Sequence, residues 1–338
     1  MSLRVNVFLI LAAATPLIAC EPPDAEYRRA LPDRATLLVP LPGQIGTESQ
    51  SLGAIGRSEK GLVGGPADLY TTSYYHARDL NALIGHVFDV LEAITQLPAT
   101  IGDDHRAVWG PLSDAGEPNE YLLAVERIDA PALHYGWVVA GKHKSAAHDA
   151  YAPIAAGAFE PTADEEGRGW LVLDFDAVAA LDPSEAGAGR IAYAFTHDAN
   201  ETAVFAEYQA QSFVSRYAFA NTADGGGFVL FAYPADIDEG QPERAAIEDV
   251  MLATRWLPSG LGRSDVIARG GDLGDAVATA SQCWGASFES TYEAFGVSGQ
   301  LLAEDGDRAA CALPMAGDSE GELLSDQDLE CPYPPTAP

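Results

Sequence analysis

Basic residues are scarce in this 338-residue chain. Nineteen Lys and Arg stand against 50 Asp and Glu, for a formal net charge of -31 at pH 7, and only three of the basic residues are lysines. Proteins bind nucleic acids largely by neutralising phosphates with Lys and Arg, so the composition argues against a nucleic-acid partner. Hydrophobic residues make up 47% and charged residues 20%, which is typical of a globular protein and excludes a wholly disordered or collagen-like chain.

Long hydrophobic runs are also lacking. The apolar run that begins at Val5 is interrupted by Asn6 and Pro16 and falls short of the roughly 20 apolar residues that a membrane-spanning helix requires. Arg4 precedes this run and small residues follow it, which is the organisation of a secretory signal peptide. We therefore expect residues 1–19 to be a signal peptide that is removed between Ala19 and Cys20.

The last four residues of this segment, Leu17-Ile18-Ala19-Cys20, resemble the lipobox of bacterial lipoproteins. The resemblance implies that the Cys20 sulfur receives a diacylglycerol, that the chain is cut before Cys20, and that the new amine is acylated. Three acyl chains exceed what stable anchoring needs, so the predicted partner is a lipid bilayer, reached through acylated Cys20. Because Glu21 rather than Asp follows the cysteine, the predicted location is the outer membrane of a bacterial envelope, facing the periplasm or the surface.

Several short strings further along the chain are similar to those of a group of uncharacterised secreted lipoproteins. This resemblance covers most of the predicted domain but implies no activity. The strings are residues 107–111, 262–266, 270–273 and 283–284.

The next segments are predicted from composition and periodicity. Residues 20–66 are rich in Pro and Gly and are expected to form a lipidated tether, within which residues 36–39 are a candidate edge strand. Residues 67–97 carry apolar residues at helical spacing and end at Leu97-Pro98, which predicts one long helix that buries its apolar stripe. The stripe consists of Leu80, Leu83, Ile84, Val87, Phe88, Leu91 and Ile94.

From about residue 105 the hydrophobic period changes to two, with turn residues between the runs. The fold class is therefore mainly β: an antiparallel meander of about ten to twelve strands, forming a half-barrel or open barrel, packed with one long N-terminal α-helix. This domain is expected over residues 67–315. Residues 316–338 are rich in Asp, Glu and Pro and predict a disordered acidic tail. At the level of architecture, a helix followed by a meander resembles the half-barrels of bacterial lipid and lipoprotein carriers.

Large aromatics alternate with Ala and polar residues along the predicted strands, so one face of the sheet is expected to pack against the helix. If the helix covers that face only in part, an apolar cavity of at least ~300 Å³ remains and an apolar ligand could bind there. The residues expected to line it are Tyr135, Trp137, Tyr193, Phe195, Tyr217 and Phe219.

Acylation of Cys20 would leave three of the four cysteines, an odd number for an oxidising compartment. We favour a Cys283–Cys311 disulfide, because both cysteines flank ordered sequence, and keep Cys311–Cys331 as the alternative.

No pattern in the chain matches a catalytic or metal-binding motif. His143 and His148 are close in sequence but are best explained as solvated loop residues. Asp174 and Asp176 could form an acid–base pair, although a strand end that enters a turn explains them better. We therefore expect no catalytic residue, no metal and no cofactor. The leading hypothesis is a non-catalytic binding or structural module of the envelope; the alternatives are a carrier of an apolar ligand and a carboxylate-dependent hydrolase.

Overall fold

The structure is a computed structural model. It describes residues 24–32, 34–39, 41–42, 63–113, 116–128, 135–163, 166–184, 187–237 and 246–315. The predicted signal peptide, the lipidation site at Cys20, the alternative disulfide partner Cys331 and the predicted acidic tail 316–338 lie outside these residues.

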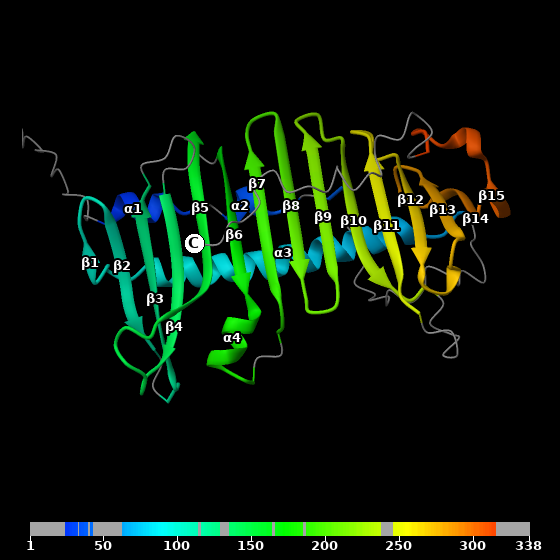
Figure 1. Cartoon of the computed structure of the whole chain (residues 1–338). Coiled ribbons are helices and arrows are strands. Elements are labelled where there is room, and N and C mark those ends of the chain that lie inside the picture. Colours follow the sequence, from blue (N-terminus) through cyan, green and yellow to red (C-terminus); the bar gives the residue numbers. More distant parts are fainter. Residues whose placement is uncertain are drawn as a thin grey trace, which may run out of the picture.

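The described residues form one antiparallel sheet of fifteen strands, in which each strand pairs with its neighbours in the sequence. The sheet does not close, so β1 and β15 are its edges (Figure 1). Its strands are β1 (Ile101–Gly102), β2 (Arg106–Leu112), β3 (Asn119–Arg127), β4 (Tyr135–His143), β5 (Ala152–Ala163), β6 (Glu166–Asp174), β7 (Arg190–His197), β8 (Glu201–Gln209), β9 (Val214–Thr222), β10 (Gly227–Ala235), β11 (Glu248–Trp256), β12 (Gly262–Gly270), β13 (Val277–Trp284), β14 (Ser290–Val297) and β15 (Gln300–Gly306).

The meander is confirmed, but the number of strands exceeds the ten to twelve expected. Two of the extra strands lack a buried hydrophobic pattern: β1 has two residues, and all seven residues of β15 are exposed. Such strands are held by main-chain pairing to a neighbour rather than by burial, so alternation in the sequence does not reveal them. Residues 242–257, whose pattern fits either helix or strand, contain β11.

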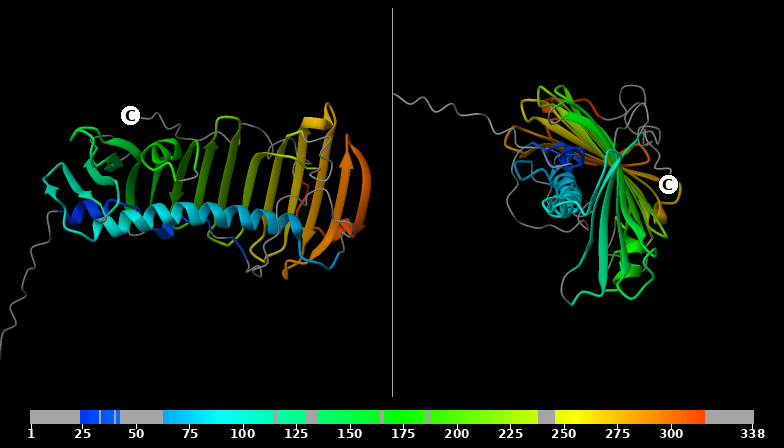
Figure 2. Two further views of the ribbon diagram at one scale, coloured as in Figure 1. Left: turned by 90° about the horizontal axis from the view of Figure 1, so that it is seen from below. Right: turned by 90° about the vertical axis from the view of Figure 1, so that its left-hand side faces the viewer.

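The long helix α3 (Asp68–Thr95) lies within the range predicted for it. It runs along one side of the sheet and across the strands (Figure 2). Its apolar stripe is buried against the sheet, with Ile84, Phe88 and Leu91 each at most 5% exposed. Burying side chains of this size stabilises the fold by roughly 1.5–3 kcal/mol each. We call the side of the sheet under α3 the helix face and the opposite side the outer face.

Polar contacts fix the first turns of α3 on the helix face. The Leu69 amide donates to Gln282 Oε1 at 2.9 Å, which satisfies one of the free N–H groups of the helix terminus. The hydroxyls of Ser73 and Thr254 are 2.6 Å apart, and Thr254 in turn contacts Ser264 at 2.7 Å. This buried chain of hydroxyl groups joins α3 to β11 and β12.

Two short helices precede α3, so the described residues between 24 and 42 pack on the domain and are not part of a tether; residues 43–62 of the predicted tether lie outside the described residues. Residues 25–29 form α1 (Ala25–Arg29) and residues 34–37 form α2 (Arg34–Leu37). Tyr27, Leu37 and Val39 are at most 3% exposed in the main core. The expected edge strand at residues 36–39 is thus wrong. Composition misled the prediction, because Pro and Gly are frequent here while a few irregularly spaced apolar residues are enough to anchor the segment.

Contacts with α3 hold this N-terminal segment in place. Asn81 binds the main chain of Val39 twice, through its Oδ1 and its Nδ2, both at 2.9 Å. At Gly85 an added Cβ would lie only 2.9 Å from the guanidinium of Arg34, so the small residue permits the close approach of α2. A fourth helix, α4 (Phe175–Leu181), follows β6.

Large aromatics on the helix face lie over glycines of the neighbouring strand. Trp284 pairs with Gly262 across β13 and β12, and Trp256 pairs with Gly227 across β11 and β10. A Cβ on either glycine would meet the indole ring at less than 3 Å. These glycines therefore make room for the rings, which is how a sheet with many aromatics on one face stays closely packed.

The outer face carries small residues and paired charges. Its apolar cluster consists of Ala194, Phe205, Leu230 and Ala253, which share one cross-strand row from β7 to β11. Ala and polar residues are frequent on this face, as predicted, but Phe205 and Trp170 also lie there, so the aromatic residues are not confined to the helix face.

Candidate functional site

A cavity of about 270 Å³ lies between the first half of α3 and strands β7 to β10. It is partly open to solvent. Its apolar wall includes Leu80, Ile191, Ala206 and Phe231. The expected apolar cavity was to be at least ~300 Å³. The space between the helix and the sheet is smaller than this, so that requirement is not met.

Helical and strand periodicity bring the lining residues together. His76 and Leu80 are one turn apart on α3, so both face the sheet. Phe231 and Tyr233 are two residues apart on β10, and Tyr217 pairs with Phe231 across β9 and β10, so these three side chains share the helix face. The cavity occurs where the stripe of α3 changes from the bulky residues of its second half to His76 and Ala77.

Three aromatic rings gather around Phe231 in the wall of this cavity. The ring of His76 lies 4.7 Å from that of Phe231 and 5.1 Å from that of Tyr233, measured between ring centres. Tyr217 meets Phe231 edge to face at 4.8 Å. Contacts of this kind hold each ring in one orientation.

Each of these polar residues has a buried atom without a hydrogen-bond partner among the described residues. The atoms are Nε2 of His76 and the hydroxyl oxygens of Tyr217 and Tyr233. A buried polar group without a partner costs about 1–3 kcal/mol, and most buried polar groups in folded proteins are paired. Each of the three atoms has less than 1 Å² of accessible surface, so it lies behind the surface of the cavity although its residue belongs to the wall.

Burial also favours the neutral form of each group. Desolvation lowers the pKa of His76, against a smaller opposing effect of Asp79. Desolvation raises the pKa of Tyr233 to about 12 and places that of Tyr217 well above its ordinary value. At neutral pH the side chains of His76, Tyr217 and Tyr233 are therefore uncharged.

Of the six residues predicted to line a cavity, Tyr217 lines this one. The other five lie elsewhere on the helix face. Three of them pack against other aromatic rings: Trp137 against Phe88, Phe195 against Phe159, and Phe219 against Trp256. The two tyrosines donate hydrogen bonds, Tyr193 to the Leu37 carbonyl and Tyr135 to the Glu26 carboxylate. Alternation identifies the face of each residue correctly, but it does not say where along the face the helix leaves space.

Sequence reasoning missed His76 and Tyr233. His76 lies one helical turn before Leu80, the first residue of the predicted stripe, so an extended stripe would have included it. Tyr233 follows the apolar residues 228–231 and lies two residues after Phe231, which is the period of a strand. Both patterns can be read from the sequence. Each shows which face of its helix or strand the residue occupies, but not whether that residue borders a cavity.

The acidic pair considered as a catalytic site has a structural role. Asp174 is the last residue of β6 and caps α4 by accepting from the Ala177 amide at 2.8 Å. Asp176 accepts from the Gly189 amide at 2.9 Å. His143 contacts the neighbouring Ser145 hydroxyl at 2.6 Å. Within the described part of the chain, no group of three His, Cys, Asp or Glu residues could hold a metal ion.

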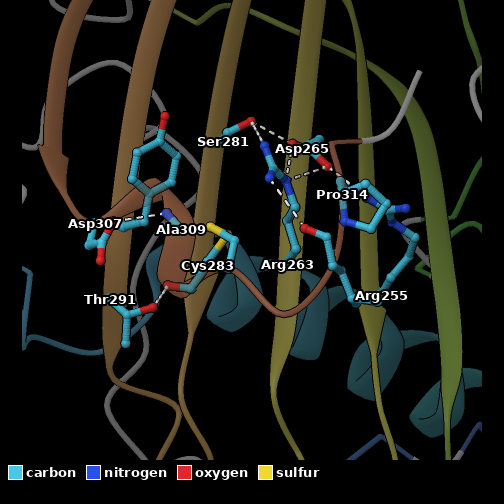
Figure 3. The surroundings of a disulfide bond; sticks show 12 residues. Arg255, Arg263, Asp265, Ser281, Cys283, Thr291, Asp307, Ala309 and Pro314 are labelled. Carbon is cyan, nitrogen blue, oxygen red and sulfur yellow. Dashed lines mark hydrogen bonds and ion pairs between the residues drawn. A yellow bond between two sulfur atoms is a disulfide. The ribbon is translucent and has the colours of Figure 1, made fainter. Parts of the chain in front are cut away.

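The disulfide joins Cys283 of β13 to Cys311, with their Cα atoms 5.5 Å apart, so the favoured pairing is confirmed over Cys311–Cys331. It ties residues 307–315 to the outer face beside a buried ionic cluster (Figure 3). There Asp265 binds both Arg263, at 2.9 Å, and Arg255, at 3.1 Å.

The two arginines also hold the segment that follows the disulfide. Arg255 donates to the Pro314 carbonyl at 2.5 Å and Arg263 to the Leu313 carbonyl at 3.4 Å. The side chains of Arg263 and Asp265 are at most 4% exposed. The cluster therefore holds the chain beyond β15 on the outer face at a second point, in addition to the disulfide. This structural role accounts for the buried charges of the cluster, and no ligand is needed to explain them.

The described residues include no helix that is both long enough and apolar enough to cross a bilayer. Comparison of the chain with known protein families, with curated proteins and with solved structures gives no match. Within the described residues, the cavity between α3 and β7 to β10 is the main feature that bears on function.

Proposed function

We propose that this protein is a lipid-anchored module of the bacterial envelope that binds a small apolar molecule, without catalysis, in the cavity between α3 and β7 to β10. The observation that carries the proposal is the cavity of about 270 Å³ with an apolar wall. Protein interiors are normally packed at the density of organic crystals, so space of this size under an otherwise well-packed helix favours a binding role.

The size of the cavity limits the ligand. An apolar cavity of roughly 150 Å³ holds one benzene molecule, so this one fits a molecule of roughly a dozen non-hydrogen atoms. That is a two-ring aromatic compound or a medium-length acyl chain. The alternative of a carrier for a whole lipid or lipoprotein would need a larger space, and we do not favour it.

The polar groups of the cavity support binding rather than turnover. A general base needs a nucleophile within hydrogen-bond reach and a group that orients it. Nε2 of His76 has no hydrogen-bond partner among the described residues. The carboxylate-dependent hydrolase is not favoured either, because Asp174 and Asp176 both cap main-chain amides.

The anchoring half of the proposal rests on the resemblance of residues 17–20 to a lipobox. Anchoring would keep the binding domain at the membrane surface, where apolar molecules concentrate.

Naphthalene is a suitable probe, because its two fused rings match the size of the cavity. Binding to the full chain, measured by equilibrium dialysis, is expected with a Kd of roughly 0.01–1 mM for a ligand of this size. Ala206→Phe fills the cavity and should abolish binding without lowering the melting temperature. Ala203→Phe is the matched control, since Ala203 lies on the same strand and faces the outer side. Equal binding by both variants would contradict the proposal.

Mass spectrometry of protein isolated from its native membrane supplies a second test. An organic extract of the wild-type protein should contain a small molecule that is absent from the Ala206→Phe protein.

A further inference from the structure

The N-terminal helix α1 begins close to the predicted lipid attachment site. Three residues, 21–23, separate Cys20 from Asp24, the residue that precedes α1. A fully extended chain spans at most ~3.6 Å per residue, so the Cα atoms of Cys20 and Asp24 lie no more than roughly 14 Å apart. Acyl chains on Cys20 would therefore enter the bilayer close to the place where α1 is held.

Hydrogen bonds hold α1 against the turn between α3 and β1. The Asp24 carboxylate, 4% exposed, accepts from the Ala99 amide at 3.1 Å. Arg28 donates to the Leu97 carbonyl at 2.9 Å. Tyr27 of the same helix is buried in the main core. The short helix is thus fixed at the β1 end of the sheet, where Figure 1 shows it beside the first strands.

The same turn exposes apolar side chains. Leu97 and Ile101 are each 47% exposed, and Pro98 between them is exposed as well. Val90, also exposed, lies about two helical turns earlier on α3. We call Val90, Leu97, Pro98 and Ile101 the end patch. Exposed apolar side chains next to a lipid anchor are suited to the boundary between the headgroups and the acyl chains.

The charge at this end of the domain is nearly balanced. Residues 24–29, 97–106 and 126–128, which include the Arg127–Glu26 ion pair, contain four arginines and five carboxylates. The whole chain has 19 basic and 50 acidic residues, so nearly all of the excess negative charge lies elsewhere. An anionic bilayer surface repels negative charge and therefore favours the approach of this end over that of any other part.

We infer that the β1 end of the domain docks on the bilayer surface, with the end patch in the lipid interface and the sheet extending away from the membrane. This inference rests on the lipid anchor of the proposed function and names the surface that meets the membrane. The opposite edge, β15, is the fifteenth strand of the sheet. At ~4.8 Å per strand it lies roughly 65 Å from β1, so its exposed Leu302 is out of reach of the interface.

Fluorescence quenching in vesicles tests the inference on the acylated full chain. One cysteine is introduced at a time, by Leu97→Cys, Ile101→Cys or Leu302→Cys, and is labelled with bimane in a Cys331→Ser background. The remaining cysteines are acylated or joined in the disulfide and do not react. The vesicles contain equal parts of phosphatidylcholine and phosphatidylglycerol, with or without a lipid that is spin-labelled just below its headgroup. Leu302 is the matched control, because it is an exposed leucine, at 55%, on the opposite edge.

We expect bimane at positions 97 and 101 to lose about half or more of its emission in the spin-labelled vesicles, because interfacial side chains lie ~5–10 Å deep. Emission from position 302 should be the same with and without the spin label. All three positions are exposed, so the variants are expected to fold, and their melting temperatures check this.

The outcomes separate the inference from the proposed function. If mass spectrometry of the native protein finds no acyl groups, the anchor fails and the inference fails with it. If the chain is acylated but positions 97 and 101 are quenched no more than position 302, the inference is overturned while the anchor stands. Equally strong quenching at all three positions would mean that the sheet lies along the membrane, which also overturns it.

Discussion

The ring of His76 lies 5.1 Å from the ring of Tyr233, yet neither polar atom has a hydrogen-bond partner among the described residues. The two residues come from α3 and β10, and both line the cavity between the helix and the sheet. Aromatic packing thus fixes the positions of two groups whose hydrogen bonds remain unused. Because each atom has less than 1 Å² of accessible surface, both are sealed within this packing and do not border the open space.

Acidification is expected to destabilise the fold through His76. Its pKa is lowered in the folded protein from an ordinary value of 6.5, so the unfolded chain binds a proton first as the pH falls. Stability contributed by the neutral ring is present above pH 6.5 and is lost below it. The titratable groups near this ring are Tyr217 and Tyr233 from the strands and Asp79 of α3, whereas the side chains of the Arg216–Glu207 pair lie on the outer face.

The measurement is the melting temperature between pH 7.5 and pH 5 in wild-type protein and in His76→Phe. The variant should lose less stability over this range. His86→Phe is the control, because His86 is an exposed residue of the same helix. If the melting temperature falls equally with decreasing pH in the wild type and in His76→Phe, the ring of His76 is not held neutral in the folded protein.

Removal of the disulfide should destabilise the protein. The bond closes a loop of 28 residues, for which the chain-entropy model gives about 3.5 kcal/mol. Urea unfolding of the Cys283→Ala/Cys311→Ala double variant measures this loss, with Cys331→Ala as the control expected to match the wild type. Peptide mapping without reduction should recover Cys283 joined to Cys311. Recovery of Cys311 joined to Cys331 would contradict the pairing.

The buried ionic cluster of the outer face should be far more sensitive than an exposed pair on the same face. Asp265→Asn leaves Arg263 and Arg255 without their carboxylate and is expected to cost about 3–5 kcal/mol. Glu207→Gln breaks a pair whose side chains are 34% and 39% exposed and should cost no more than about 1 kcal/mol. Chemical unfolding measures the loss in the free energy of unfolding for both variants. Equal losses would argue against a role of Asp265 in holding the chain beyond β15 on the sheet.

Lipidation at Cys20 follows from the resemblance to a lipobox. Intact-protein mass spectrometry of membrane-extracted material should show a chain that begins at residue 20 and carries acyl groups. Cys20→Ser should give an unprocessed or soluble protein without lipid, whereas Cys331→Ser should be lipidated normally. Thioether-linked lipid on the Cys20→Ser protein would refute the assignment.

Periodicity alone was enough to predict the antiparallel meander, the long helix near residues 67–97 and the face on which each aromatic lies. The reason is that these features depend on neighbours within a few residues, where a period of 3.6 or 2 decides which side chains share a face. The Cys283–Cys311 bond was also foreseen, because both cysteines flank ordered segments.

Only the tertiary structure decided the rest. Tyr27, Leu37 and Val39 are buried because α3 and the sheet leave a gap that fits them, and a Pro- and Gly-rich composition hid this. Trp137 and Phe219 packed against other aromatics, while Tyr217 was left beside a cavity, although all three have the same pattern in the sequence. Which residue faces empty space depends on how a helix lies across many strands, and that is a property of long-range packing that no local pattern contains.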